Sequence, residues 1–179
     1  MSDRSQWPLA CIGLGSNLGQ SRQLLLAAWQ TLGEHPAVFL QQISPPYLTK
    51  PIDMHSPHWF INAAGLLRSS LSPDSLLDVL LETELHFGRV RDPEQQGYQD
   101  RTLDLDLLLY DQYILRTEHL ILPHPKLHKR LFVLGPLADI APELLHPLIG
   151  KSIAQLFAKI KAELELDSLK RVSWDEPAD

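Results

Sequence analysis

The sequence is poor in cysteine and contains no long hydrophobic run. Its single cysteine, Cys11, cannot form a disulfide within the chain, which favours a protein of the reducing cytoplasm. No stretch approaches the roughly 18 consecutive apolar residues of a membrane-spanning helix. Residues 1–7 are polar and lack the apolar core of a signal peptide. We therefore expect a cytoplasmic protein without a membrane partner.

The chain also lacks an excess of positive charge. It has 16 basic and 22 acidic residues and a net charge of -6, whereas proteins that bind nucleic acid normally carry a basic surface. No nucleic-acid partner is expected. Its 179 residues, 44% of them hydrophobic, are typical of one globular domain and show neither an internal repeat nor a long linker. We expect a single domain over residues 1–179, with its core at about 8–165 and frayed termini, and a monomer.

Several common nucleotide-binding and catalytic motifs are absent. A dinucleotide fingerprint would start at Gly13 but needs a third glycine where Leu18 stands, and residues 13–20 do not match a P-loop. There is no Cys/His spacing of a zinc site and no Gly-x-Ser-x-Gly motif. What remains is Gly15-Ser16-Asn17, whose small residues allow a ligand to approach closely. Taken alone, this segment is more typical of an ordinary strand-to-helix turn.

The most informative segment that is present covers residues 101–110, where leucine and aspartate alternate. This period of two is typical of a half-buried strand, and it places Asp104 and Asp106 on the face opposite the leucines. Two residues along a strand span roughly 6.6 to 7 Å, so both carboxylates can reach one small volume. A solvated outer face is the alternative that this short motif leaves open.

Arginines lie close to the two aspartates in the sequence. Arg101 precedes them directly, and Arg89 and Arg91 stand upstream, just after Glu84 and the end of a predicted helix. Carboxylates that hold a hard divalent cation beside guanidinium groups that hold phosphate indicate chemistry on a magnesium nucleotide. We expect the polar segment 89–101 to be mobile without ligand and to close over phosphate.

A second basic cluster surrounds His124, which stands between two prolines. Its other members are Lys126, His128, Lys129 and Arg130. A polar surface loop would explain such a cluster. A clamp for a triphosphate would explain it too, and it is the more attractive reading because the whole chain is acidic.

The periodicity predicts a mixed fold. We expect strands at 9–14, 38–43, 60–67 and 102–110 with a hairpin partner at 113–116, helices at 21–32, 72–88, 131–138 and 152–164, and a proline-rich loop at 44–59. The second and third strands can form a hairpin, which argues against a purely parallel, doubly wound sheet. These features predict an α+β fold, a ferredoxin-like α/β/α sandwich with a mainly antiparallel sheet.

Taken together, these motifs closely resemble the 6-hydroxymethyl-7,8-dihydropterin pyrophosphokinase family of folate biosynthesis, over about residues 12–148. The residues that carry the resemblance are Gly15-Ser16-Asn17, Asn62-Ala63-Ala64, Glu84, Gly88-Arg89-Val90-Arg91, Arg101-Thr102-Leu103-Asp104-Leu105-Asp106-Leu107-Leu108, Pro123-His124 and Arg130. The resemblance implies that ATP gives its β,γ-pyrophosphoryl group to the hydroxymethyl oxygen of the pterin and that AMP is released.

The resemblance also implies a role for each site residue. The catalytic residues would be Arg89, Arg91, Arg101, Asp104 and Asp106, with two Mg²⁺ ions held by Asp104 and Asp106. ATP would be bound by Glu84, Arg89, Arg91, His124 and Arg130. The pterin would be bound by Thr49, Ile52, Phe60, Asn62 and Phe132, with the aromatic rings stacking on the flat substrate.

The chain departs from the best-known members between Arg91 and Arg101, where those carry an additional Arg-Trp pair and a Gly-Pro before the arginine. Here the segment has no arginine or tryptophan, Tyr98 is its aromatic residue, and the acidic Asp92 and Asp100 are unexpected beside phosphate. His119 stands where some members have arginine. Two other functions remain open: a different magnesium-dependent nucleotidyl- or phosphotransferase, which would release pyrophosphate or ADP, and a non-catalytic homologue that binds a nucleotide or a pterin.

Overall fold

The computed structural model describes residues 3–51, 56–89, 100–163 and 169–175. Its centre is a six-stranded sheet with the order β5-β1-β4-β3-β8, in which β2 also pairs with β4. These strands are β1 (Leu9–Ser16), β2 (Val38–Ile43), β3 (Tyr47–Thr49), β4 (Phe60–Ser69), β5 (Asp104–Tyr110) and β8 (Leu169–Arg171). All pairings recorded between them are antiparallel.

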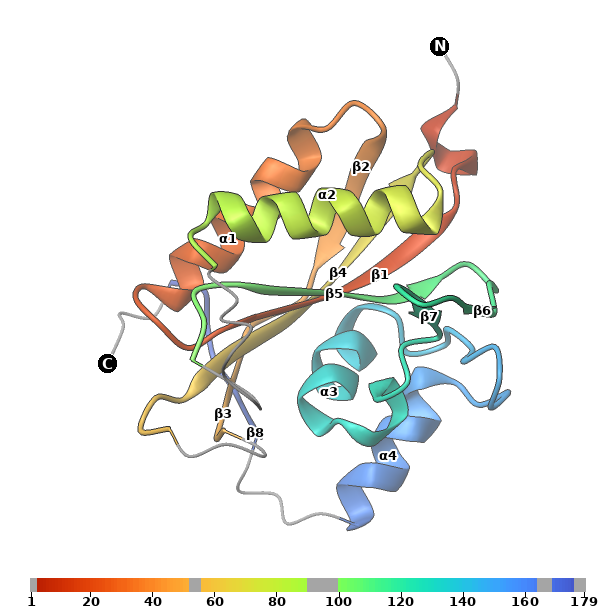
Figure 1. Cartoon of the computed structure of the whole chain (residues 1–179). Helices are drawn as coiled ribbons and strands as arrows, with labels where there is room; N and C mark the ends of the chain where they lie inside the picture. Colours follow the sequence, from red (N-terminus) through yellow and green to blue (C-terminus); the bar gives the residue numbers. More distant parts are fainter. Residues whose placement is uncertain (1–2, 52–55, 90–99, 164–168, 176–179) are drawn as a thin grey trace.

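Helices cover both faces of the sheet (Figure 1). On one face lie α1 (Ser21–Glu34) and α2 (Pro73–His86), and on the other α3 (Leu131–Ile140) and α4 (Ile153–Glu163). Two short 3₁₀ helices, η1 (Arg4–Gln6) and η2 (Leu127–Lys129), complete the helical elements of the described ranges. The predicted α+β sandwich with a mainly antiparallel sheet is therefore confirmed. None of the helices described is long and apolar enough to cross a membrane.

Helix α2 shows how local sequence fixes the element that carries Glu84. The hydroxyl of Ser72 accepts a hydrogen bond from the amide of Ser75, and Pro73 occupies the first turn, where its missing N–H costs nothing. After the helix, Gly88 adopts φ = 78°, a left-handed conformation that glycine tolerates readily. The predicted helix at 72–88 is thus confirmed to within two residues at each end, and Arg89, just after it, contacts the start of β5.

Strand β5 confirms the predicted alternation. Leu103, Leu105 and Leu107 are at most 3% exposed and belong to the core beneath α1 and α2. The side chains of Asp104 and Asp106 are 21% and 34% exposed and lie on the opposite face, the face that α3 covers in part. The two carboxylates are therefore fixed on one face by the burial of the leucines on the other.

Two predictions of local structure were wrong. Residues 44–59 do not form one loop, because β3 pairs with β4 on one side and with β8 on the other. Residues 113–116 do not pair with β5. Instead β6 (Leu115–Arg116) pairs with β7 (Ile121–Leu122) in a separate two-stranded sheet, whose turn is closed by hydrogen bonds between Thr117 and Leu120. The hairpin predicted between β5 and residues 113–116 is thus replaced by one between β6 and β7, whose turn is hydrogen-bonded.

The expectation of a frayed C-terminal tail was also wrong for the part described. Strand β8 extends the sheet at β3, and the indole of Trp174 donates a hydrogen bond to the carbonyl of Ser44 at 3.1 Å. Pairing with β3 satisfies backbone groups that a free tail would expose to water, and the ring of Trp174 packs against the core beneath α1 and α2. Residues 176–179 lie outside the described residues.

Candidate active site

The face of the sheet that α3 covers in part has a polar end, built from three neighbouring strands. Across β5, β1 and β4, Asp104 lies opposite Gly15, and Gly15 lies opposite Asn62; Asp106 lies opposite Gly13. The glycines have no side chain to separate these groups, and a Cβ on Gly15 would come within 3.0 Å of Oδ1 of Asn62. The glycines of β1 thus leave room between two carboxylates and an amide.

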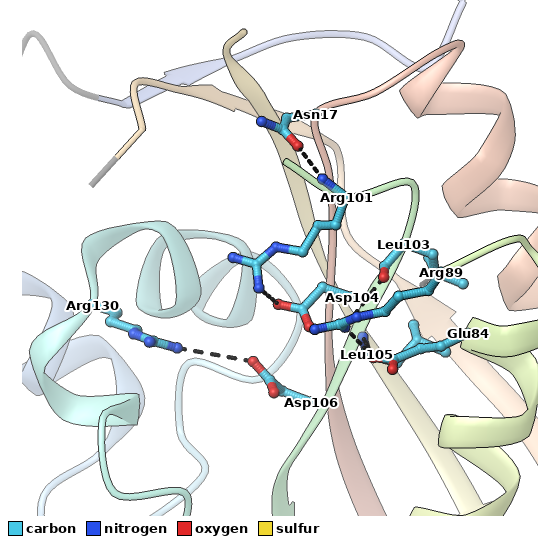
Figure 2. Close-up of polar contacts among 9 residues, drawn as sticks. All are labelled: Asn17, Glu84, Arg89, Arg101, Leu103, Asp104, Leu105, Asp106 and Arg130. Carbon is cyan, nitrogen blue, oxygen red and sulfur yellow. Dashed lines mark hydrogen bonds and ion pairs between the residues drawn. The ribbon is translucent and has the colours of Figure 1, made fainter. Parts of the chain in front are cut away.

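Asp104 lies between two arginines (Figure 2). Nη1 of Arg89 donates a hydrogen bond to Oδ1 of Asp104, and Nη1 of Arg101 lies 3.1 Å from Oδ2. Arg89 also donates to the carbonyl of Leu103 at 3.2 Å, which fixes its guanidinium against β5. The structure therefore brings together three of the residues that the sequence predicted to be catalytic.

Glu84 is a second carboxylate partner of Arg89. Its carboxylate is 2% exposed and accepts hydrogen bonds from Nη1 of Arg89 at 2.6 Å and from the amide of Leu105 at 2.7 Å. The side chain thereby joins α2 to β5 and orients Arg89 toward Asp104. Two hydrogen bonds thus engage Glu84 within the protein, and the ATP contact that the resemblance implies for it stays a prediction.

Asp106 has a weaker cationic partner. Nη1 of Arg130 lies 3.9 Å from its Oδ2. Burial, with a further contribution from Asp104, raises the pKa of Asp106 to about 6, although Arg130 and Arg101 act in the opposite direction. A carboxylate whose ionised form is this poorly compensated suits a divalent cation.

Among the residues that the structure describes, no three His, Cys, Asp or Glu side chains converge as a metal site. A cation at this face would therefore have two carboxylates, those of Asp104 and Asp106, as its protein ligands. Mg²⁺ is usually bound by one or two carboxylates, with substrate phosphates and water as its other ligands. Asp104 and Asp106 fit that pattern, and a site that depends on substrate phosphate is consistent with the arginines around them.

His124 is hydrogen-bonded to β5 through its backbone. Its amide donates a hydrogen bond to the carbonyl of Leu108 at 2.9 Å, and its Nδ1 accepts one from the amide of Lys126 at 3.2 Å. Burial, together with the charge of Arg130, lowers the pKa of His124 to about 4. Because Nδ1 is an acceptor, the proton of the neutral ring resides on Nε2, so His124 can offer a ligand a hydrogen bond but no positive charge.

Two predicted pterin residues form a buried polar pair beside the carboxylates. Nδ2 of Asn62 donates to Oγ1 of Thr49 at 2.7 Å, and the two residues are 6% and 3% exposed. The pairing of β3 with β4 places Thr49 opposite Phe60. The three residues therefore lie together on adjacent strands at the polar end of the sheet.

Two arginines of the site also contact its aromatic rings. The guanidinium carbon of Arg101 lies 5.4 Å from the centre of the Phe60 ring, and that of Arg130 lies 5.4 Å from the centre of the Phe132 ring. Such cation–π contacts stabilise the arginines without neutralising them. Each arginine therefore connects an aromatic residue predicted to bind pterin with a carboxylate predicted to bind metal. Of the remaining predicted site residues, Ile52 and Arg91 lie outside the described residues.

Asn17 had no specific role in the sequence-based prediction, although the segment that contains it was singled out. Asn17 is 4% exposed, and its side-chain Oδ1 accepts a hydrogen bond from the backbone amide of Arg101 at 2.8 Å. The backbone amide of Asn17 donates to the carbonyl of Arg101 at 3.1 Å. The partners are 84 positions apart, so no local pattern could have indicated this contact.

Comparison with known proteins identifies the family of this chain. The profile of the family described as 7,8-dihydro-6-hydroxymethylpterin-pyrophosphokinase (HPPK) matches residues 11–142, which include every site residue that the sequence predicted. The chain belongs to the HPPK family. The resemblance identified from the motifs is thereby confirmed.

Several relatives carry the name 2-amino-4-hydroxy-6-hydroxymethyldihydropteridine pyrophosphokinase, and three of them illustrate the similarity. The protein of Bacillus subtilis is 38% identical over 136 residues, which cover 76% of this chain and 80% of that protein. The protein of Pseudomonas aeruginosa is 39% identical over 147 residues (82% and 88% of the two chains). The protein of Porphyromonas gingivalis is 40% identical over 137 residues (76% and 92%).

Solved structures show the same fold. A Plasmodium falciparum HPPK-DHPS structure with pteroate superposes with a TM-score of 0.72 at 14% identity, over 93% of this chain and 48% of that one. A crystal structure of HPPK-DHPS in complex with substrates gives a TM-score of 0.71 at 15% identity, over 92% and 47%. This chain thus spans about half the length of these two-part proteins. At such low identity the likeness shows the ferredoxin-like HPPK fold alone.

Proposed function

We propose that this chain transfers the pyrophosphoryl group of Mg-ATP to the hydroxymethyl group of 6-hydroxymethyl-7,8-dihydropterin, giving AMP and the pterin diphosphate in folate biosynthesis. Membership of the HPPK family supports the reaction class. The observation that carries the proposal is one sheet face on which Asp104 and Asp106 are flanked by arginines. The Asn62–Thr49 pair lies on neighbouring strands of the same sheet.

In the reaction one bond forms and one bond breaks at the β-phosphorus of ATP. The hydroxymethyl oxygen of the pterin bonds to the β-phosphorus of ATP, and the bond from that phosphorus to the oxygen bridging to the α-phosphate breaks. The hydroxyl proton is lost and AMP leaves with the bridging oxygen. Negative charge is redistributed over phosphate oxygens, so the protein contributes mainly alignment and charge neutralisation.

The carboxylate pair and the arginines share the phosphate half of the site. Asp104 and Asp106 would hold Mg²⁺, two ions by the family pattern, which neutralise phosphate charge and align the reacting groups when bound. Arg101 and Arg130 stand on either side of the pair and can donate charge-assisted hydrogen bonds to phosphate oxygens. Arg89 is held by Glu84, so its charge stays beside Asp104.

The remaining predicted residues would bind the two substrates. Asn62 and Thr49 offer hydrogen-bonding groups to the edge of the pterin, and Phe60 and Phe132 offer ring faces for stacking. His124 would donate from Nε2 to ATP next to Arg130. Ile52 on the pterin side and Arg91 on the ATP side complete the proposed set.

The products distinguish this function from its alternatives. Phosphorus NMR of the protein with Mg-ATP and the reduced pterin alcohol should show AMP and the pterin diphosphate in equal amounts, with no reaction when the 6-hydroxymethyl group is replaced by methyl. ADP as the nucleotide product, or free pyrophosphate with a nucleotidylated pterin, would instead assign the site to one of the other transferases. Binding of both ligands without turnover would indicate a non-catalytic homologue.

A further inference from the structure

Asp100 stands directly before Arg101, where a negative charge beside a phosphate site is unexpected. The structure shows what this carboxylate contacts. Its Oδ1 accepts a hydrogen bond from Nδ2 of Asn17 at 2.6 Å, and the carboxylate also accepts one from the side chain of Ser56. Both donors are neutral, and their hydrogen bonds lower the pKa of Asp100 below its ordinary value. The side chain of Asp100 is thus engaged by Asn17 and Ser56.

The hydrogen bond to Asp100 determines which way the amide group of Asn17 faces. A carboxylate only accepts hydrogen bonds, so Asn17 must present Nδ2 to Asp100, and its Oδ1 is left for the backbone amide of Arg101. Asn17 also donates its own backbone amide to the carbonyl of Arg101. Both backbone polar groups of Arg101 are therefore held by one buried residue at the end of β1.

The position of the Arg101 backbone decides what its guanidinium can reach. From this anchored position the side chain passes over the ring of Phe60 and places Nη1 at 3.1 Å from Oδ2 of Asp104. Catalytic groups that act by alignment lose much of their effect when displaced by about 1 Å. A residue that fixes residue 101 therefore contributes to the reaction without contacting a substrate.

We propose that Asp100 is a positioning residue, which fixes Arg101 through Asn17 and so aligns the guanidinium with the carboxylate pair. In the best-known members a Gly-Pro precedes this arginine, and proline restricts the backbone by its ring. In this chain a hydrogen-bonded carboxylate restricts the same point. The catalytic consequence rests on the proposed function, whereas the hydrogen-bond chain from Asp100 through Asn17 to Arg101 can be tested without it.

Steady-state kinetics tests the catalytic part. Asp100→Ala should lower kcat about tenfold, the scale of one lost hydrogen bond to a charged group, and leave the KM of the pterin within twofold. Asp100→Asn should keep most of kcat, because its amide oxygen still accepts from Asn17. Asp78→Ala removes the same charge from the exposed surface of α2 and is the matched control, with kinetics equal to wild type.

An exchange of donor and acceptor gives a sharper test. Asn17→Asp alone should lower kcat, because two carboxylates then face each other. Asn17→Asp combined with Asp100→Asn should restore kcat. The side-chain amide now at position 100 would donate to the carboxylate now at position 17, and that carboxylate would still accept from the backbone amide of Arg101. If the double variant is no more active than Asn17→Asp alone, the proposal is wrong.

Nitrogen-15 NMR of the substrate-free protein tests the hydrogen-bond chain itself. In Asp100→Ala, the side-chain amide signals of Asn17 and the backbone amide of Arg101 should shift and exchange with water faster than in wild type. Unchanged signals together with wild-type kcat would overturn the proposal. So would an equal loss in kcat and pterin affinity with general destabilisation, which indicates a structural role only. A wild-type protein that makes no pterin diphosphate would refute the proposed function, while these signals would still decide the contact.

Discussion

Nη1 of Arg89 lies 2.6 Å from Oε1 of Glu84, a carboxylate that is only 2% exposed. The same oxygen accepts a hydrogen bond from the backbone amide of Leu105. One buried charge thus connects α2, β5 and the arginine nearest to Asp104. Removing Glu84 would leave the buried amide of Leu105 without an acceptor and Arg89 with Asp104 as its remaining carboxylate partner, a larger loss than that of an exposed pair.

Glu84→Ala should therefore lower the free energy of unfolding by about 2 kcal/mol, because the buried amide of Leu105 loses its acceptor and Arg89 loses one of its two carboxylate partners. Urea denaturation measures this loss. The matched control is Glu82→Ala on the exposed side of the same helix, for which we expect a change of less than about 0.5 kcal/mol. Equal effects in the two variants would show that the Glu84 contacts contribute nothing to stability.

Asp106 should make the metal-free protein less stable at neutral pH. Its pKa in the folded state is raised from 3.8 to about 6, so the folded protein holds this proton more tightly than the unfolded chain. The contribution of Asp106 to the free energy of unfolding therefore falls as pH rises from 3.8 to about 6. Asp106→Asn should be more stable than wild type at pH 8, and this advantage should disappear near pH 4.

Thermal or urea unfolding in the presence of EDTA, at several pH values, checks this expectation. Adding Mg²⁺ and an ATP analogue should stabilise wild type but not Asp106→Asn, because bound metal supplies the missing positive charge. A constant difference in stability between the two proteins from pH 4 to 8 would contradict the raised pKa.

The Asn62–Thr49 pair should matter for the pterin and not for the nucleotide. Asn62→Ala should weaken pterin binding by about 1 to 3 kcal/mol, the cost of leaving a buried polar edge without its partner. Thr49→Val keeps the volume but removes the acceptor for Nδ2 of Asn62, so its effect should have the same direction. Calorimetry with each ligand separately measures both affinities. Unchanged pterin affinity in Asn62→Ala would leave Asn62 with a structural role only.

His124 should act as a neutral hydrogen-bond donor throughout the physiological range. Its pKa is lowered from 6.5 to about 4, so the folded state binds this proton less tightly than the unfolded chain, and stability falls as pH drops through that interval. In NMR spectra of the substrate-free protein, the imidazole signals of His124, assigned with His124→Gln, should not titrate between about pH 5.5 and 8. A titration midpoint near 6.5 would show that His124 supplies positive charge to the nucleotide.

Local sequence patterns predicted the elements that build the phosphate half of the site. The alternation in β5 depends on burial of its own leucines, and the end of α2 depends on Gly88, so both could be recognised within a few residues. The position of Arg101 beside Asp104 followed from their spacing along one chain segment. That Arg101 lies near Asp104 therefore needed little knowledge of the tertiary structure, whereas the ion pair of Arg89 with Asp104 was not predicted.

Contacts between distant segments could not be predicted in this way. Strand β3 has only three residues and follows two prolines, and its pairing with β8 joins segments more than 100 positions apart. The burial of Glu84 depends on how α2 packs against β5, which its sequence neighbours do not specify. Asn17, which donates a hydrogen bond to Asp100, is likewise 83 positions away, so the sequence alone could not explain a negative charge at residue 100.

The central claim is that Asp104 and Asp106 act together on one sheet face to support transfer of pyrophosphate from ATP. It is tested most directly by single-turnover formation of AMP from Mg-ATP and the reduced pterin alcohol in Asp104→Asn and Asp106→Asn, with Asp78→Asn as control. We expect both site variants to remain folded and to lose about a thousandfold or more in rate, since metal-ion charge stabilisation contributes several kcal/mol. Asp78→Asn should match wild type. AMP formation at the wild-type rate in either site variant would contradict the claim.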